Sequence, residues 1–157
     1  MHKMFLTFGA FGILVSCTTA NAEMNWITST RPYLEARSSE PESDASLRAI
    51  CRSPASIEVR IGANEQVGKG HGEPVKLIFV GNGRQVIVRG ISERSSDYEM
   101  TGGTELVADL LPGNKLFDLL ISGQPVQMGG TLKNKATWSG DKMVSAVRSF
   151  LTACKGN

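Results

Sequence analysis

The residues that could do chemistry gather in one glycine-rich segment, residues 68–73, with the sequence Gly-Lys-Gly-His-Gly-Glu. His71 and Glu73 stand two positions apart, and such a pair can move protons as a general acid and base. The glycine spacing fits neither the dinucleotide fingerprint nor a phosphate-binding loop, which needs Gly-Lys-Ser/Thr. The glycines predict a mobile connection, and His71 with Glu73 is the candidate functional pair on it.

Carboxylates form a second group of candidates, because two suitably placed acids are sufficient to cleave a glycosidic bond. The group consists of Glu73, Glu99, Glu105 and Asp109. Their spacing along the chain does not place any two of them together, so a carboxylate-dependent hydrolase is an alternative function. The sequence has no Gly-x-Ser-x-Gly motif and no cluster of metal-ligating histidines. We therefore predict no catalytic residue, no metal and no cofactor, and expect a protein that is not an enzyme.

The first 22 residues predict export. Lys3 precedes an apolar run over residues 4–15, and Ala20-Asn21-Ala22 forms a small-residue exit, which is the pattern of a secretory signal peptide over residues 1–22. The run is shorter than the roughly twenty residues of a membrane-spanning helix. Cleavage removes His2 and leaves His71 as the single histidine. It also lowers the formal net charge of +2 by one, with the signs interspersed, so we expect no nucleic-acid partner.

Cys17 gives this segment a second interpretation. Leu14-Val15-Ser16-Cys17 resembles the bacterial lipobox, in which the cysteine becomes the lipidated first residue. In that case the chain is a lipid-anchored structural lipoprotein and reaches the membrane only through Cys17. The expected location is periplasmic or secreted in the first interpretation and membrane-anchored in the second.

Cys51 and Cys154 are the two cysteines that remain after the leader. An even pair in an oxidising compartment predicts one disulfide. It would join an early strand to the last turn of the final helix and close a loop of about one hundred residues, worth roughly 4 to 5 kcal/mol by loop entropy. Two buried free thiols, or a reactive cysteine, are the alternatives, and export disfavours both.

The chain divides into a flexible lead-in over residues 23–46 and a single globular domain over residues 47–157. The lead-in is polar, charged and interrupted by prolines. The domain opens with a predicted strand over 57–61, where apolar and charged residues alternate, and a partner strand over 47–52. Residues 75–80 and 85–89 predict a hairpin, because Asn82-Gly83 between them suits a tight turn.

The second half of the domain supplies the helical part of the prediction. Residues 105–111 predict two helical turns capped by Thr104, and residues 115–121 predict a mostly buried strand. Ser139 is the expected N-cap of a final amphipathic helix. Its apolar stripe consists of Met143, Val144, Val147, Phe150, Leu151 and Cys154. The predicted fold is α+β: an antiparallel β-sheet or small β-sandwich, with a C-terminal amphipathic helix packed on it and one disulfide.

The order of elements over residues 76–154 resembles that of small alphaproteobacterial periplasmic proteins of the invasion-associated locus B type. The residues that carry the resemblance are Pro112-Gly113-Asn114-Lys115-Leu116, Ser139-Gly140 before the final helix, and Trp26 near the mature start. That family has more cysteines, and this chain has none in the corresponding middle region. The resemblance implies an envelope accessory or host-interaction role and supplies no catalytic residues.

The sequence as a whole favours an exported, non-enzymatic envelope protein that binds another macromolecule. An inhibitor, a host-interaction protein and a module that stabilises an assembly all belong to this class. The expected partner is a protein or another envelope macromolecule, and the oligomeric state is left open.

Overall fold

The computed structural model describes residues 24–29, 33–38, 46–63, 65–129, 132 and 135–156. The proposed signal peptide and Cys17 lie outside these residues. Nine strands in the described part form one antiparallel sheet in the order β1-β2-β3-β4-β7-β6-β5-β8-β9. The strands are β1 (Met24–Ser29), β2 (Tyr33–Ser38), β3 (Ser46–Ser53), β4 (Ser56–Gly62), β5 (His71–Gly81), β6 (Arg84–Arg94), β7 (Thr104–Leu110), β8 (Val126–Gly129) and β9 (Ala136–Trp138). The helices are α1 (Tyr98–Thr101), α2 (Lys115–Leu120) and α3 (Asp141–Lys155).

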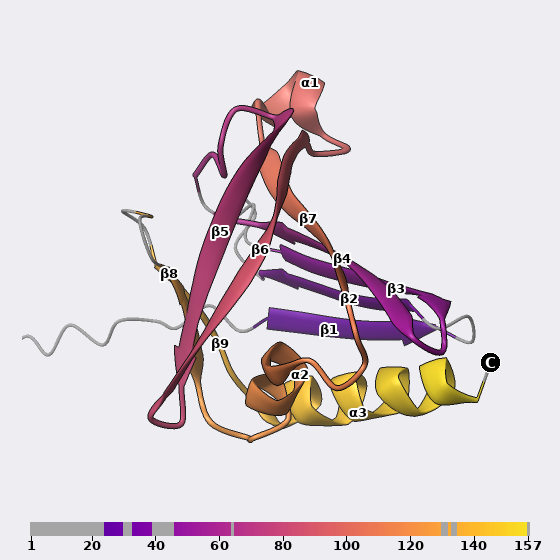
Figure 1. Cartoon of the computed structure of the whole chain (residues 1–157). Coiled ribbons are helices and arrows are strands. Elements are labelled where there is room, and N and C mark those ends of the chain that lie inside the picture. The colour runs from indigo at the N-terminus through magenta and orange to yellow at the C-terminus, as the bar shows by residue number, and fades with distance from the viewer. Residues whose placement is uncertain are drawn as a thin grey trace, which may run out of the picture.

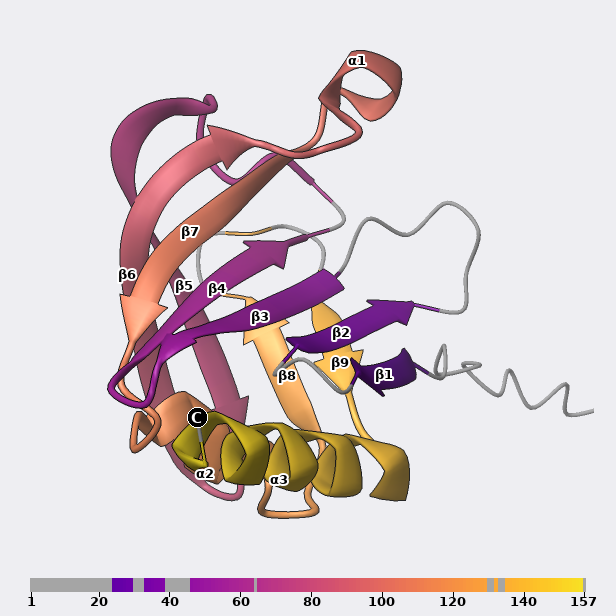
Figure 2. The same cartoon turned by 90° about the vertical axis from the view of Figure 1, so that its right-hand side faces the viewer.

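The sheet curls into a half-barrel, and the two helices α2 and α3 lie across its lower opening (Figures 1 and 2). The curl brings the two ends of the sheet close to each other. Trp26 on β1 meets Trp138 on β9 edge to face, with ring centroids 6.2 Å apart. Helix α3 packs along β1 and so covers one end of the sheet, which protects an edge strand from pairing with other chains. The predicted α+β fold is confirmed.

The predicted hairpin is confirmed as β5 and β6, which are longer than the sequence indicated. The turn places Asn82 at φ 47° and Gly83 at φ 66°. Positive φ at both central positions is the geometry that favours Asn-Gly in two-residue hairpin loops. The glycine-rich segment, for which the sequence predicted a mobile connection, is strand in its second half, since β5 already begins at His71.

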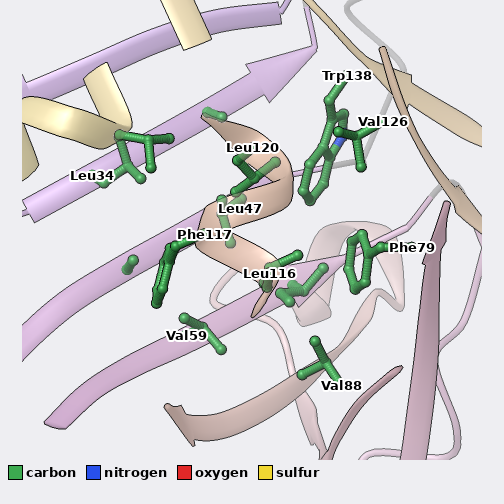
Figure 3. Close-up of a cluster of buried hydrophobic side chains, with 14 of the residues drawn as sticks. Leu34, Leu47, Val59, Phe79, Val88, Leu116, Phe117, Leu120, Val126 and Trp138 are labelled. Carbon is green, nitrogen blue, oxygen red and sulfur yellow. The ribbon is translucent and has the colours of Figure 1, made fainter. Parts of the chain in front are cut away.

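Helix α2 occupies residues for which the sequence predicted a strand, and that prediction is wrong. Leu116, Phe117 and Leu120 enter the core between the sheet and α3 (Figure 3). Their spacing suits one face of a helix. The Asn114 side chain accepts a hydrogen bond from the Leu116 amide at 2.9 Å and thereby caps the first turn.

Strand β7 occupies residues for which the sequence predicted a helix, and that prediction is also wrong. β7 lies between β4 and β6 and pairs with both. Leu106 and Leu110 point into the core, whereas Asp109 is exposed. The two neighbouring strands supply backbone partners over its length, so the tertiary context determines the strand rather than the local preference of the segment.

The expected flexible lead-in over residues 23–46 contains β1 and β2, so this expectation is wrong where the structure describes the segment. β2 pairs with β3 on one side and β1 on the other. Leu34 and Ala36 are completely buried, while Glu35 between them lies on the opposite face. This alternation suits a strand with one buried face, and the sheet begins well before residue 47.

The predicted disulfide joins Cys51 on β3 to Cys154 near the end of α3, with the Cα atoms 5.6 Å apart. It fixes the C-terminal turn of the helix to the sheet. The N-cap of α3 is Gly140, one residue after the predicted Ser139. Among the described residues, no helix combines the length and apolar character needed to cross a membrane.

Candidate functional site

The contact between His71 and Glu73 joins the backbone N–H group of His71 to the carboxylate of Glu73. The Glu73 carboxylate accepts hydrogen bonds from the backbone N–H groups of Lys69 and His71, the latter at 3.0 Å. These bonds, that from Lys69 foremost, lower the pKa of Glu73 to about 2. Successive backbone N–H groups in a glycine-rich turn form a concavity that suits an anion. The glycine-rich segment therefore encloses a carboxylate of its own chain.

The same segment is fixed to the sheet by two buried hydroxyl groups. Gly70 donates its backbone N–H to the Ser92 hydroxyl at 2.9 Å, and that hydroxyl donates to the Val67 carbonyl at 2.5 Å. The Val67 N–H donates to the Thr104 hydroxyl at 2.7 Å. We expected a mobile connection here, and these bonds instead give the segment defined partners.

The four candidate carboxylates lie in separate environments. Glu73 closes the glycine-rich segment, Glu99 is exposed on α1, and Asp109 is exposed on β7. Glu105 is the buried member, with a side-chain exposure of 2%. Glu73 binds backbone amides and Glu105 binds arginines, so these two carboxylates have different hydrogen-bond partners.

Glu105 forms the centre of an ion-pair network on the outer face of the half-barrel. One carboxylate oxygen accepts from Arg60 at 2.8 Å and the other from Arg48 at 2.7 Å. Arg60 also contacts Glu93 at 3.1 Å and Glu58 at 3.0 Å. The network ties β3, β4, β6 and β7 together.

The electrostatics of this network favour the charged forms. Hydrogen bonding from Arg52 lowers the pKa of the Glu58 carboxyl; burial opposes the shift and Arg60 adds to it. Burial alone would lower the pKa of the Arg60 guanidinium, but hydrogen bonds to Glu105 and Glu58 outweigh it and raise that pKa. A fully paired cluster of this kind is suited to holding strands together.

The outer face of the hairpin β5–β6 carries exposed aliphatic side chains instead of ion pairs. Leu77, Phe79 and Val88 point into the core, so the residues between them point outward. Val80, Ile87 and Ile91 are exposed by 46%, 43% and 41%. We use the name aliphatic face for the surface formed by Ile78, Val80, Ile87, Ile91 and Leu111. Leu111 is exposed by 67%.

A groove runs beside the aliphatic face, between the hairpin and the start of α2. It consists of two adjoining hollows of about 430 and 610 Å³, which share Gln85, Val86 and Lys115. The larger hollow is lined in part by Ile87 and Leu111, so the groove continues directly from the aliphatic face. Asn82, Asn114 and Ser122 add amide and hydroxyl groups to its lining.

Four basic side chains lie within the aliphatic face or line the groove: Lys76 and Arg89 on the face, and Arg84 and Lys115 in the groove. In the part of the chain that the structure describes, none of them takes part in an ion pair. Lys76 and Arg89 are direct cross-strand partners, an arrangement of like charges that costs stability. Asp118 is the acidic residue of the groove lining.

Sequence reasoning missed the aliphatic face, although a signal for it exists. Residues 75–80 are apolar at nearly every position, which leaves aliphatic side chains on both faces of the strand. A strand with one solvated face would alternate instead. The sequence does not show which of the two faces the core covers.

Comparison of the chain with protein-family models, curated proteins and solved structures finds no match in any of the three. The resemblance to the invasion-associated locus B type therefore stays an expectation from the sequence.

Proposed function

We propose that this chain is an exported, non-enzymatic binding module that docks another macromolecule of the cell envelope through the aliphatic face. The observation that carries the proposal is the cluster of exposed aliphatic side chains on one sheet face, beside a groove. Exposed apolar side chains gathered on one face mark an interaction surface more often than those scattered singly.

The disulfide supports the export part of the proposal, because such bonds persist in oxidising compartments. The apolar run and Ala20-Asn21-Ala22 point the same way. Intact mass spectrometry of the protein from the envelope fraction tests this part. We expect a chain that starts at Glu23 and carries the mass deficit of one disulfide. A mass that starts at a lipidated Cys17 would contradict the free form and favour the lipoprotein.

Site-specific photocrosslinking in the native cells tests the binding part. A photoreactive residue replaces Ile87 on the aliphatic face, and a matched one replaces Ile27, which is exposed by 54% on β1. We expect a discrete crosslinked product in the envelope fraction from position 87 and none of the same size from position 27. Equal labelling from both positions, or none from position 87, would contradict the proposal.

A further inference from the structure

The basic side chains on the aliphatic face follow a regular pattern, and this pattern indicates which kind of partner the face can bind. Between Gln85 and Glu93, the outward positions of β6 are Ile87, Arg89 and Ile91, so aliphatic and basic side chains alternate there at every second residue. Along β5, Lys76 and Ile78 stand directly opposite Arg89 and Ile87. Two neighbouring strands thus present the same aliphatic–basic order side by side.

The basic residues of the aliphatic face differ from those of the ion-pair network, because they make no ion pair among the described residues. The arginines of the network on β3 and β4 are all paired with carboxylates. Lys76 and Arg89 lie opposite each other without an ion pair among the described residues. The register of β6 with β7 places the exposed Asp109 on the other side of Arg89, so the row Asp109, Arg89, Lys76 carries one more positive than negative charge. Their mutual repulsion weakens the hairpin, and an acidic group placed between them would turn this cost into attraction.

On this basis we propose that the aliphatic face binds an extended segment of a partner protein with the pattern aliphatic–x–acidic–x–aliphatic. In an extended segment, alternate side chains share a face and repeat about every 6.6 Å, as they do along β6. Its acidic residue meets Lys76 and Arg89, and its two aliphatic residues cover Ile87 and Ile91. This inference rests on the proposed function and adds the class of partner.

The groove favours a peptide over a lipid surface as the occupant. Gln85, Asn82 and Ser122 line it with amide and hydroxyl groups, which can bond the backbone of an extended segment. Arg84 and Lys115 add two basic side chains to the lining of the same groove. A flat membrane surface cannot enter this groove, whereas an extended segment can lie along it and reach these groups.

The test is a selection from a display library of random dodecapeptides on the purified exported protein with its disulfide intact. We expect the selected peptides to carry the predicted pattern, with acidic residues enriched and lysine and arginine depleted. A synthetic copy of the most enriched peptide then gives affinities. Arg89→Glu should weaken binding about tenfold, because an exposed ion pair is lost and replaced by repulsion, and Ile91→Ser should weaken it about fivefold or more through lost apolar contact.

Matched variants on other surfaces serve as controls. Arg148→Glu reverses an exposed charge on α3, and Ile27→Ser removes an exposed aliphatic side chain on β1; both should leave the affinity unchanged. Enrichment of basic peptides, or equal effects of test and control variants, would overturn the inference. So would binding of phosphatidylglycerol–phosphatidylethanolamine vesicles with no peptide selected. A crosslink from position 87 combined with a different peptide pattern would overturn this inference alone and leave the proposed function standing.

Discussion

Replacing the buried carboxylate of the ion-pair network, Glu105→Gln, should destabilise the fold by about 2 to 3 kcal/mol. Removing one partner of a fully buried ion pair costs about 3 to 5 kcal/mol, and an exposed pair is worth at most about 1 kcal/mol. Glu105 is buried, but Arg48 and Arg60 keep side-chain exposures of 22% and 29%. Water therefore partly compensates the two guanidinium groups, and the expected cost lies between these limits.

Urea unfolding followed by tryptophan fluorescence measures this effect, because Trp26 and Trp138 report on the contact between the two ends of the sheet. In a separate thermal unfolding experiment the melting temperature should fall by about 10 °C, as expected for this loss in a domain of this size. Glu93→Gln is the matched control: its side chain is 38% exposed and makes one contact with Arg60, so its cost should stay below about 1 kcal/mol. Equal costs for the two variants, or a Glu105→Gln protein as stable as the wild type, would refute the reasoning.

Three further predictions follow from particular contacts. Replacing both Cys51 and Cys154 with alanine opens a loop with a sequence separation of 103 and should cost about 4 to 5 kcal/mol in urea unfolding; a cost below about 1 kcal/mol would contradict the role of the disulfide. Glu73 should titrate at a pKa of about 2 in a carboxyl NMR titration. Because the folded pKa lies below the ordinary value of 4.5, the stabilisation is complete above that value and is lost as the pH falls towards 2. In Gly68→Ala a Cβ would lie 2.5 Å from the Glu73 carboxylate, so the pKa should rise; an unchanged pKa would show that the loop amides do not set it. Asn114→Ala removes the cap of α2 and should cost about 1 kcal/mol, whereas Asn114→Asp keeps an acceptor and should cost less; equal losses would count against the cap.

The hairpin and the final helix could be predicted because their signals are local. Asn82-Gly83 specifies a turn by the φ angles that it tolerates. The stripe of α3 repeats at helical spacing from Met143 to Cys154. The disulfide followed from counting the cysteines that remain after the predicted leader, which needs no knowledge of the fold.

The predictions for β7 and α2, in which helix and strand were interchanged, failed because their signals are not local. The glycines and Thr104 before β7 resemble the start of a helix in sequence. The segment forms a strand because β4 and β6 supply backbone partners on both sides. For α2, the cap Asn114 and the buried pair Leu116 and Phe117 were visible in the sequence. Short apolar runs fit both periods, and the fold decides between them.

The candidate site shows the same limit. His71 and Glu73 stood out by residue type, yet backbone groups that the sequence does not distinguish hold the Glu73 carboxylate. The aliphatic face depends on which side of β5–β6 the core covers, and the core includes α2, predicted as a strand. Residues far apart in sequence, such as Ile87 and Leu111, meet only in the folded chain.

Photocrosslinking in the native cells from position 87, compared with position 27, tests the central claim most directly. Docking through the aliphatic face predicts a discrete envelope product from position 87 that disappears when Arg89→Glu is added. A product that forms equally from both positions, or that persists unchanged with Arg89→Glu, would contradict the assignment of this face as the binding site.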